Sequence, residues 1–164
     1  MLRSAWTLDP GVVFLNHGSF GACPTPVLEA QTRWRERLER QPVQFFVRDL
    51  EPLLDEARAA LAEFVGSPAD CLAWVTNATT AVNAVLRSMN FRAGDELLVT
   101  DHAYNACRNA LDFVAERSGA RVVVAPLPLP IDDPGRIVES IVGAVGPRTR
   151  LALIDHVTSQ TGLV

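Results

Sequence analysis

From Leu72 onward, short apolar runs alternate with longer amphipathic stretches, and this alternation constrains the fold more than any other feature of the sequence. Apolar runs of about four to eight residues, rich in valine and leucine, are typical of buried strands, whereas longer amphipathic stretches are typical of helices. Strands that alternate with helices form a largely parallel sheet that is covered by helices on both faces. The sequence therefore predicts an α/β fold over residues 71–164.

The individual elements follow from the same pattern. We expect strands at Leu72–Thr76, Glu96–Thr100, Arg121–Ala125 and Leu151–Asp155. We expect helices at Ala78–Met89, Tyr104–Ser118 and Pro134–Val145. A parallel sheet needs crossover helices to cover its faces, and no helix follows the last expected strand. We therefore expect a truncated domain, as if the fold had been cut.

Residues 1–70 are predicted to be mainly helical. A brief apolar run at Val12–Leu15 predicts a short strand, and helices are expected at about Val27–Arg40 and Leu50–Val65. Pro42 should end the first helix, and Gly66 should cap the second. Each helix carries an apolar stripe that we expect to face inward. The stripes consist of Val27, Ala30, Trp34 and Leu38, and of Leu53, Leu54, Ala57, Leu61 and Phe64.

Composition argues against several classes of function. Of the 164 residues, 48% are hydrophobic and 21% are charged, which is typical of soluble globular proteins. The net charge of −4 offers no broad basic field, so nucleic acid is not an expected partner. The apolar runs are too short to span a bilayer, and the N-terminus lacks the apolar stretch of a secretion signal. We expect no membrane partner and a cytoplasmic location.

The cysteines do not form a recognisable motif. Cys23, Cys71 and Cys107 are odd in number, lie far apart and include no CxxC pair, so a zinc or redox site is not indicated. We expect reduced thiols, with Cys71 and Cys107 packed as small apolar residues.

Polar residues of unusual type gather where the expected strands end. In open α/β sheets, ligands bind outside the carboxyl ends of the strands. All three histidines of the chain and its only tyrosine occupy such positions, so we expect a ligand site at this edge. The gathered residues are His17, Asn77, Thr79, Thr80, Asp101, His102, Tyr104, Asp155, His156, Thr158, Ser159 and Gln160.

The start of the helix at about Ala78 is a candidate anion site. Asn77 is a good N-cap residue. The free N–H groups and the positive dipole end of a helix start attract anions, and the threonine hydroxyls of Thr79 and Thr80 add donors. The same pattern also fits a capped helix that binds nothing, and the residues alone leave both readings open.

Three segments together resemble a known family. They are Phe14–Gly21 (FLNHGSFG), Val75–Val82 (VTNATTAV) and Asp155–Gly162 (DHVTSQTG). They resemble the class V aminotransferases, pyridoxal-phosphate (PLP) enzymes that include cysteine desulfurases, and above all the isopenicillin N epimerase-like branch. The resemblance spans nearly the whole chain. It implies the large domain of a fold type I PLP-dependent transferase, entered by residues 1–70 and begun but not completed by residues 71–164.

The resemblance implies which residues hold the cofactor. Asn77, Ala78, Thr79 and Thr80 would cradle the PLP phosphate. Tyr104 or His102 would stack on the pyridine ring, and branch members resembling this sequence carry tyrosine at the position of Tyr104. Alternatively, neither residue binds a ligand. The Tyr104 hydroxyl would then lie in water, and His102 would be a polar residue of a loop.

Further roles are implied at the edges of the site. Ser159 would reach the phenolic oxygen of PLP. Cysteine desulfurases usually carry asparagine there, so Ser159 is a departure that weighs against a desulfurase. His17 and Ser19 would border the pocket of an amino-acid substrate.

The sequence contains no lysine, because all 15 basic residues are arginine. Family members hold PLP on a lysine that lies later in the chain than any residue present here. The resemblance therefore implies an N-terminal fragment of a homodimeric enzyme. Its parent would act on an amino acid through an external aldimine, as an epimerase, C–S lyase or aminotransferase. The alternative is a non-catalytic remnant of the fold that binds a phosphate ligand or a partner chain.

Overall fold

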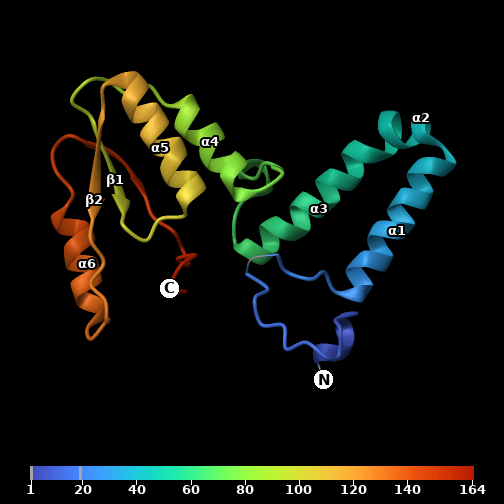
Figure 1. Cartoon of the computed structure of the whole chain (residues 1–164). Helices are drawn as coiled ribbons and strands as arrows, with labels where there is room; N and C mark the ends of the chain where they lie inside the picture. Colours follow the sequence, from blue (N-terminus) through green and yellow to red (C-terminus); the bar gives the residue numbers. More distant parts are fainter. Residues whose placement is uncertain (1, 19) are drawn as a thin grey trace. The chain divides into compact units, whose positions relative to one another are not determined.

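A computed structural model describes residues 2–18 and 20–164 of the chain. They form two compact units, Met1–Trp74 and Val75–Val164 (Figure 1). No helix among the described residues is long and apolar enough to cross a membrane.

The second unit is built on a parallel sheet. Its strands are β1 (Glu96–Thr100), β2 (Arg121–Ala125) and β3 (Thr149–Leu153), in the order β2-β1-β3. The central strand pairs with both neighbours, and all its residues are buried. The predicted bounds of β1 and β2 are confirmed, as is the predicted parallel α/β architecture.

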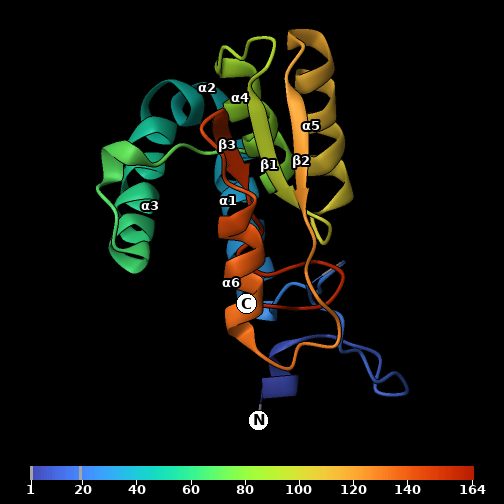
Figure 2. The same cartoon turned by 90° about the vertical axis from the view of Figure 1, so that its left-hand side faces the viewer.

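Helices cover both faces of this sheet. α4 (Ala78–Ser88) and α5 (Asn105–Ser118) lie on one face, and α6 (Pro134–Gly143) lies on the other (Figure 2). Alternate residues of β1 point to opposite faces, so Leu97 and Val99 share one core with the first two helices. That core also includes Leu86, Ala110, Leu111 and Ala115.

Two predicted strands of the second half need correction. Leu72–Thr76 forms no strand, because no strand among the described residues pairs with it. β3 begins and ends two residues before the predicted span Leu151–Asp155. Its pairing with β1 places Leu153 opposite Val99, close to the end of the central strand, and the chain then turns away.

The first unit is helical, as predicted. α1 spans Thr25–Arg40, the short α2 spans Pro42–Gln44, and α3 spans Leu50–Val65 after a π-helical turn at Phe45–Asp49. Pro42 begins α2 just after α1 has ended, and Gly66 caps α3 with a left-handed φ of 70°. The strand predicted at Val12–Leu15 is wrong, because this run has no strand partner among the described residues.

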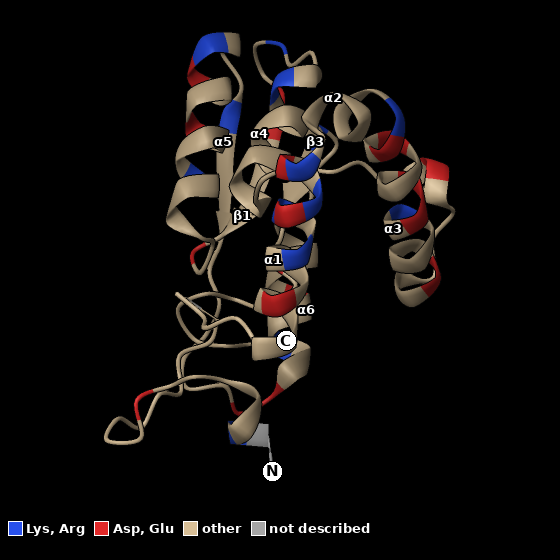
Figure 3. Cartoon of the chain, turned by 90° about the vertical axis from the view of Figure 1, so that its right-hand side faces the viewer, with Lys and Arg blue, Asp and Glu red and all other residues tan. Residues whose placement is uncertain are grey.

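The predicted apolar stripes of α1 and α3 are largely exposed. No residue of α1 is buried, and Ala62 is the only buried residue of α3. Trp34 is 45% exposed and Phe64 is 87% exposed, so the expectation that these side chains face inward is wrong in this chain. Basic and acidic residues alternate along α1, which gives it a solvated face (Figure 3).

The three cysteines are free thiols. Cys107 is buried, as predicted, whereas Cys71 is exposed, which corrects the expectation that it packs as a small apolar residue. Cys71 lies in a short 3-10 turn at Ala69–Cys71, before the region where the sheet begins. Cys107, by contrast, is one of the buried residues of α5.

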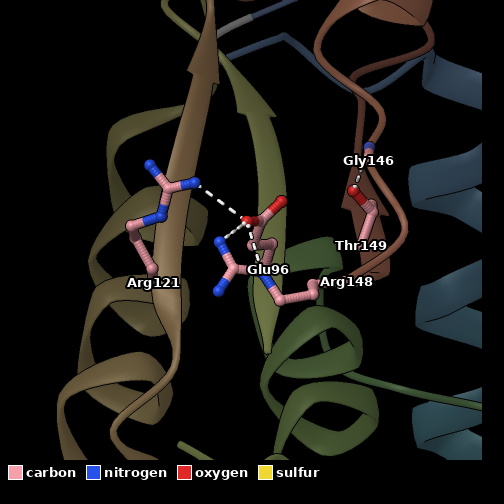
Figure 4. Close-up of polar contacts among 5 residues, drawn as sticks. All are labelled: Glu96, Arg121, Gly146, Arg148 and Thr149. Carbon is pink, nitrogen blue, oxygen red and sulfur yellow. Dashed lines mark hydrogen bonds and ion pairs between the residues drawn. The ribbon is translucent and has the colours of Figure 1, made fainter. Parts of the chain in front are cut away.

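An ion cluster stands at the amino end of the sheet. Glu96, the first residue of β1, accepts hydrogen bonds from Arg121 at 2.9 Å and from Arg148 at 2.9 and 3.1 Å (Figure 4). The Arg121 guanidinium is the main reason why the pKa of Glu96 is lowered. This cluster joins β1 and β2 to the residue that precedes β3, and it lies at the edge opposite to the predicted ligand site.

Candidate functional site

The carboxyl edge of the sheet brings together segments that are far apart in the sequence. Tyr104 precedes α5, and its backbone N–H donates to the carboxylate Oδ2 of Asp155 at 3.0 Å. Asp155 follows β3, so this bond joins the end of one strand to the start of a helix 51 residues away. Asp101, just after β1, makes a comparable link by accepting the N–H of Leu127 at 2.8 Å.

The start of α4 is capped by the side chain of Asn77. Asn77 is extended, and its Oδ1 accepts the N–H of Thr80 at 2.8 Å and the hydroxyl of Thr80 at 3.1 Å. The predicted N-cap is therefore confirmed. The N–H groups of Ala78 and Thr79 belong to the first turn of the helix and have no acceptor within it. Together with the positive dipole end, they can bind an anion.

Thr79 connects this helix start to the start of α5. Burial is the main cause that raises the pKa of the Cys107 thiol, and the negative charge of Asp155 adds to it. A hydrogen bond with the Thr79 side chain acts in the opposite direction. Residues from α4, α5 and the segment after β3 therefore meet around one buried thiol.

The sequence reasoning missed the bond between Asp155 and the Tyr104 backbone, and it missed that Cys107 interacts with the Thr79 side chain. Asp155 appeared there only as one polar strand-end residue among many, and Cys107 appeared as core. The sequence spacing could have predicted that Cys107 lies near Tyr104. Cys107 comes three residues after Tyr104 and so lies in the first turn of the helix that Tyr104 precedes.

The structure separates the two predicted ring-stacking residues. The Tyr104 side chain is 47% exposed at the carboxyl edge, whereas His102 is only 7% exposed. Nδ1 of His102 lies 3.2 Å from the Thr161 hydroxyl, which is itself 2.8 Å from the hydroxyl of Thr158. His102 thus lies against the closing turn at residues 158–163, and the Tyr104 ring remains available.

The other predicted site residues are more scattered. Ser159 and His156 are exposed on the segment after β3, beside the buried Thr158. His17 belongs to the first unit, where its ring packs edge-on against Phe14 at 4.8 Å. His17 also lines a pocket of about 360 Å³, together with Arg3, Trp6, Leu8, Val12, Val13, Phe14 and Leu15. Ser19 lies outside the described residues.

Comparison with known proteins identifies the family. The aminotransferase class-V family model matches residues 23–164. The chain belongs to the class V aminotransferase family, as its sequence motifs predicted.

Curated relatives agree with this assignment. Isopenicillin N epimerase of Streptomyces clavuligerus is 40% identical over 162 residues, which covers 99% of this chain and 41% of that protein. A putative L-cysteine desulfhydrase of Oryza sativa subsp. japonica is 37% identical over 171 residues, which covers 95% of this chain and 35% of that protein. The chain therefore spans about two fifths of the length of these relatives.

Solved structures show the same relation. The cystine C–S lyase C-DES, in complex with its reaction product cysteine persulfide, superposes with a TM-score of 0.83 at 27% identity and covers 96% of this chain. A C-DES mutant with glycine covalently linked to the PLP cofactor gives a TM-score of 0.84 at 27% identity. In each case the match covers 42% of the solved chain. The fold is that of part of a PLP-dependent enzyme, and PLP is the cofactor of the family.

Proposed function

We propose that the complete protein is a PLP-dependent enzyme that removes the α-hydrogen of an amino acid, which leads either to cleavage of a C–S bond at the β-carbon or to epimerisation at the α-carbon. The single observation that supports this most is the bond between the Tyr104 backbone and Asp155 at the carboxyl edge of the sheet, one helical turn from Cys107, which interacts with the Thr79 side chain. An anion-binding helix start and a half-exposed aromatic ring thereby share one edge. These two features suit the phosphate and the pyridine ring of one cofactor molecule.

The phosphate would be held at the start of α4. The N–H groups of Ala78 and Thr79 point out of the first turn, and the Thr79 hydroxyl is a further donor. The side-chain amide of Asn77 can also donate, since its Oδ1 is engaged by Thr80. The Thr80 hydroxyl is shared with Asn77 and with Thr76, 3.1 Å away, so we assign Thr80 mainly to shaping the cap. This donor set fits a phosphate dianion.

The ring would rest on Tyr104. Its half-exposed side chain can present a face to a planar ligand, whereas His102 is buried against the turn that contains Thr161. We therefore assign the stacking function to Tyr104 and a structural function to His102. Ser159 remains our candidate for the phenolic oxygen, and His17 and Ser19 remain our candidates for contact with the substrate.

Bound PLP supplies an electron-accepting ring that makes the α-hydrogen of an amino acid removable. This chain's own residues would bind and orient the cofactor at its phosphate and its ring face. The side-chain amine that links family members to PLP would come from another part of the complete protein, because these 164 residues include no lysine.

The reaction class can be tested on the purified complete protein. Incubated with PLP in D₂O, it should exchange the α-hydrogen of L-cysteine, L-cystine or another amino acid for deuterium, as followed by proton NMR. Release of sulfide would select C–S lysis, and accumulation of the D-isomer would select epimerisation. A protein that binds PLP but neither exchanges nor converts any amino acid would contradict the proposal and favour a non-catalytic binding function.

The cofactor contacts can be tested in the same protein. Thr79→Val removes a hydroxyl but keeps the shape of the side chain, and a lost charge-assisted hydrogen bond costs about 1.5–3 kcal/mol. PLP affinity should therefore fall about tenfold or more. Tyr104→Ala should shift the visible spectrum of bound PLP more than His102→Ala does. The opposite ranking of the two ring variants would show that Tyr104 is wrongly assigned.

A further inference from the structure

We propose that Asp155 is a positioning residue for Tyr104. Its carboxylate holds the backbone from which the Tyr104 ring projects, at a distance of 3.0 Å between Oδ2 and the Tyr104 nitrogen. This inference rests on the proposed function, since it matters for the enzyme only if Tyr104 faces the cofactor. It assigns a function to a residue for which we propose no contact with PLP or with the substrate.

The first argument is that α5 has no cap of its own. Tyr104 occupies the N-cap position, and its side chain makes no capping hydrogen bond. In a capping box, the third helical residue reaches back to the N–H of the N-cap residue. Here that third residue is Cys107, which is too short and too weak an acceptor for this bond. Asp155 supplies the missing acceptor from a segment 51 residues away.

The second argument is that the same turn of α5 faces the helix start at α4. Cys107, whose side chain is 5% exposed, interacts with the Thr79 side chain and with the charge of Asp155. A displacement of this turn would therefore move the stacking ring and disturb the phosphate end together. A carboxylate at the N-terminus of a helix is also favoured by the helix dipole.

The chain offers a matched control in Asp101. Its carboxylate also follows a strand of the same sheet and also accepts one remote backbone N–H, from Leu127 at 2.8 Å. That bond holds the segment between β2 and α6, which contributes no proposed cofactor contact. A general loosening of the sheet edge should appear in Asp101 and Asp155 variants alike, whereas loss of ring position should appear only in the latter.

The experiment uses the complete protein with PLP and the variants Asp155→Ala, Asp155→Asn and Asp101→Ala. Asp155→Ala should weaken PLP binding about fivefold, the factor that corresponds to loss of one cap, and should shift the visible circular dichroism of the bound cofactor. Asp155→Asn keeps an acceptor oxygen in place and should restore the wild-type band. Asp101→Ala should keep the band, even if its midpoint of unfolding in urea falls as far as that of Asp155→Ala.

A second readout does not depend on the cofactor. In the PLP-free protein, loss of the Asp155 charge removes one cause of the raised pKa of Cys107, so iodoacetamide should modify the Cys107 peptide faster in both Asp155 variants. Peptide mass mapping separates this thiol from the exposed Cys23 and Cys71. Asp101→Ala should leave the rate at Cys107 unchanged.

Three outcomes would overturn the proposal. A wild-type dichroism band and PLP affinity in Asp155→Ala would show that the bond does not position the ring. An equal band shift in Asp101→Ala would assign the effect to the sheet edge in general, and failure of Asp155→Asn to restore the band would assign it to charge. If the wild-type protein binds no PLP, the proposed function fails. Labelling of Cys107 that is faster in Asp155→Ala than in Asp155→Asn would still show that the bond holds this turn, because both variants lack the charge.

Discussion

Helices α3 and α5 have the same kind of sequence and very different surroundings. Both are amphipathic, and both end at a glycine in the left-handed conformation, Gly66 with a φ of 70° and Gly119 with a φ of 73°. α5 buries Cys107, Ala110, Leu111 and Ala115 against the sheet and α4, whereas α3 buries only Ala62. An amphipathic pattern therefore identifies the helix and the face that can be buried. It does not identify a layer that buries this face.

The largest expected effect is on the free energy of unfolding, and it tests this comparison with one leucine from each helix. Leu111 of α5 is fully buried, and Leu61 of α3 is 39% exposed. Leu111→Ala should lower the free energy of unfolding by about 2–5 kcal/mol, because it removes packed atoms and leaves a cavity. Leu61→Ala should cost about 1 kcal/mol or less.

Urea unfolding of the 164-residue chain can check both values. Tryptophan fluorescence reports the first unit, which contains Trp6, Trp34 and Trp74, and far-UV circular dichroism reports both units. Equal losses for the two variants would mean that the exposed face of α3 is covered in solution.

The same contrast explains what the sequence could predict. The apolar run of β1 is buried and that of β2 pairs with it along its whole length, so both have partners that the chain itself provides, and their bounds were predicted correctly. The runs at Val12–Leu15 and Leu72–Thr76 have similar composition but no strand partner, and neither forms a strand. Pairing is a property of two segments, so the pattern of one segment cannot decide it.

At the candidate site, the sequence predicted the contact between neighbouring residues but not the contact between residues that are far apart in the chain. The cap at Asn77 is encoded by neighbouring residues, so VTNATT was sufficient to predict it. The bond between Asp155 and Tyr104 joins residues 51 positions apart, and its existence depends on where β3 ends. No local rule predicts that the Tyr104 N–H at the start of α5 is bound by a carboxylate from the segment that follows β3. Whether the predicted contacts hold PLP stays a prediction.

A smaller effect is expected at the two capping glycines. Alanine in the left-handed conformation costs about 1–2 kcal/mol, so both Gly66→Ala and Gly119→Ala should destabilise the chain. An added Cβ at Gly66 would meet nothing within 4 Å, whereas one at Gly119 would lie 3.2 Å from the Cβ of Ala93. Gly119→Ala should therefore cost more, by up to about 1 kcal/mol, because the neighbour must move.

Thermal or urea denaturation of the two glycine variants measures this difference, and their shared φ makes each the control for the other. If Gly66→Ala is the more destabilising change, the close contact between Gly119 and Ala93 does not determine the cost of alanine at the end of α5.

The smallest effect on stability is expected from the carboxylate in each unit that accepts hydrogen bonds from arginine side chains. Hydrogen bonds from Arg121 and then Arg148 lower the pKa of Glu96, and hydrogen bonds from Arg37 and Gln44 lower the pKa of Asp49. Glu96 has the less exposed side chain, at 9% against 20% for Asp49. The arginines themselves are well exposed, so solvent and salt screen both pairs.

The sign of the pH effect follows from the lowered pKa. Each carboxylate contributes its full stabilisation above its ordinary pKa, and this contribution is lost as the pH falls through the lower pKa of the folded state. Glu96→Gln should therefore destabilise the chain at neutral pH, and its urea midpoint should approach that of the wild type as the pH falls through the lowered pKa of Glu96. Asp49→Asn should show the same trend with a smaller gap. A gap that stays constant from neutral to acidic pH would mean that Glu96 acts through packing at the end of β1 and not through its charge.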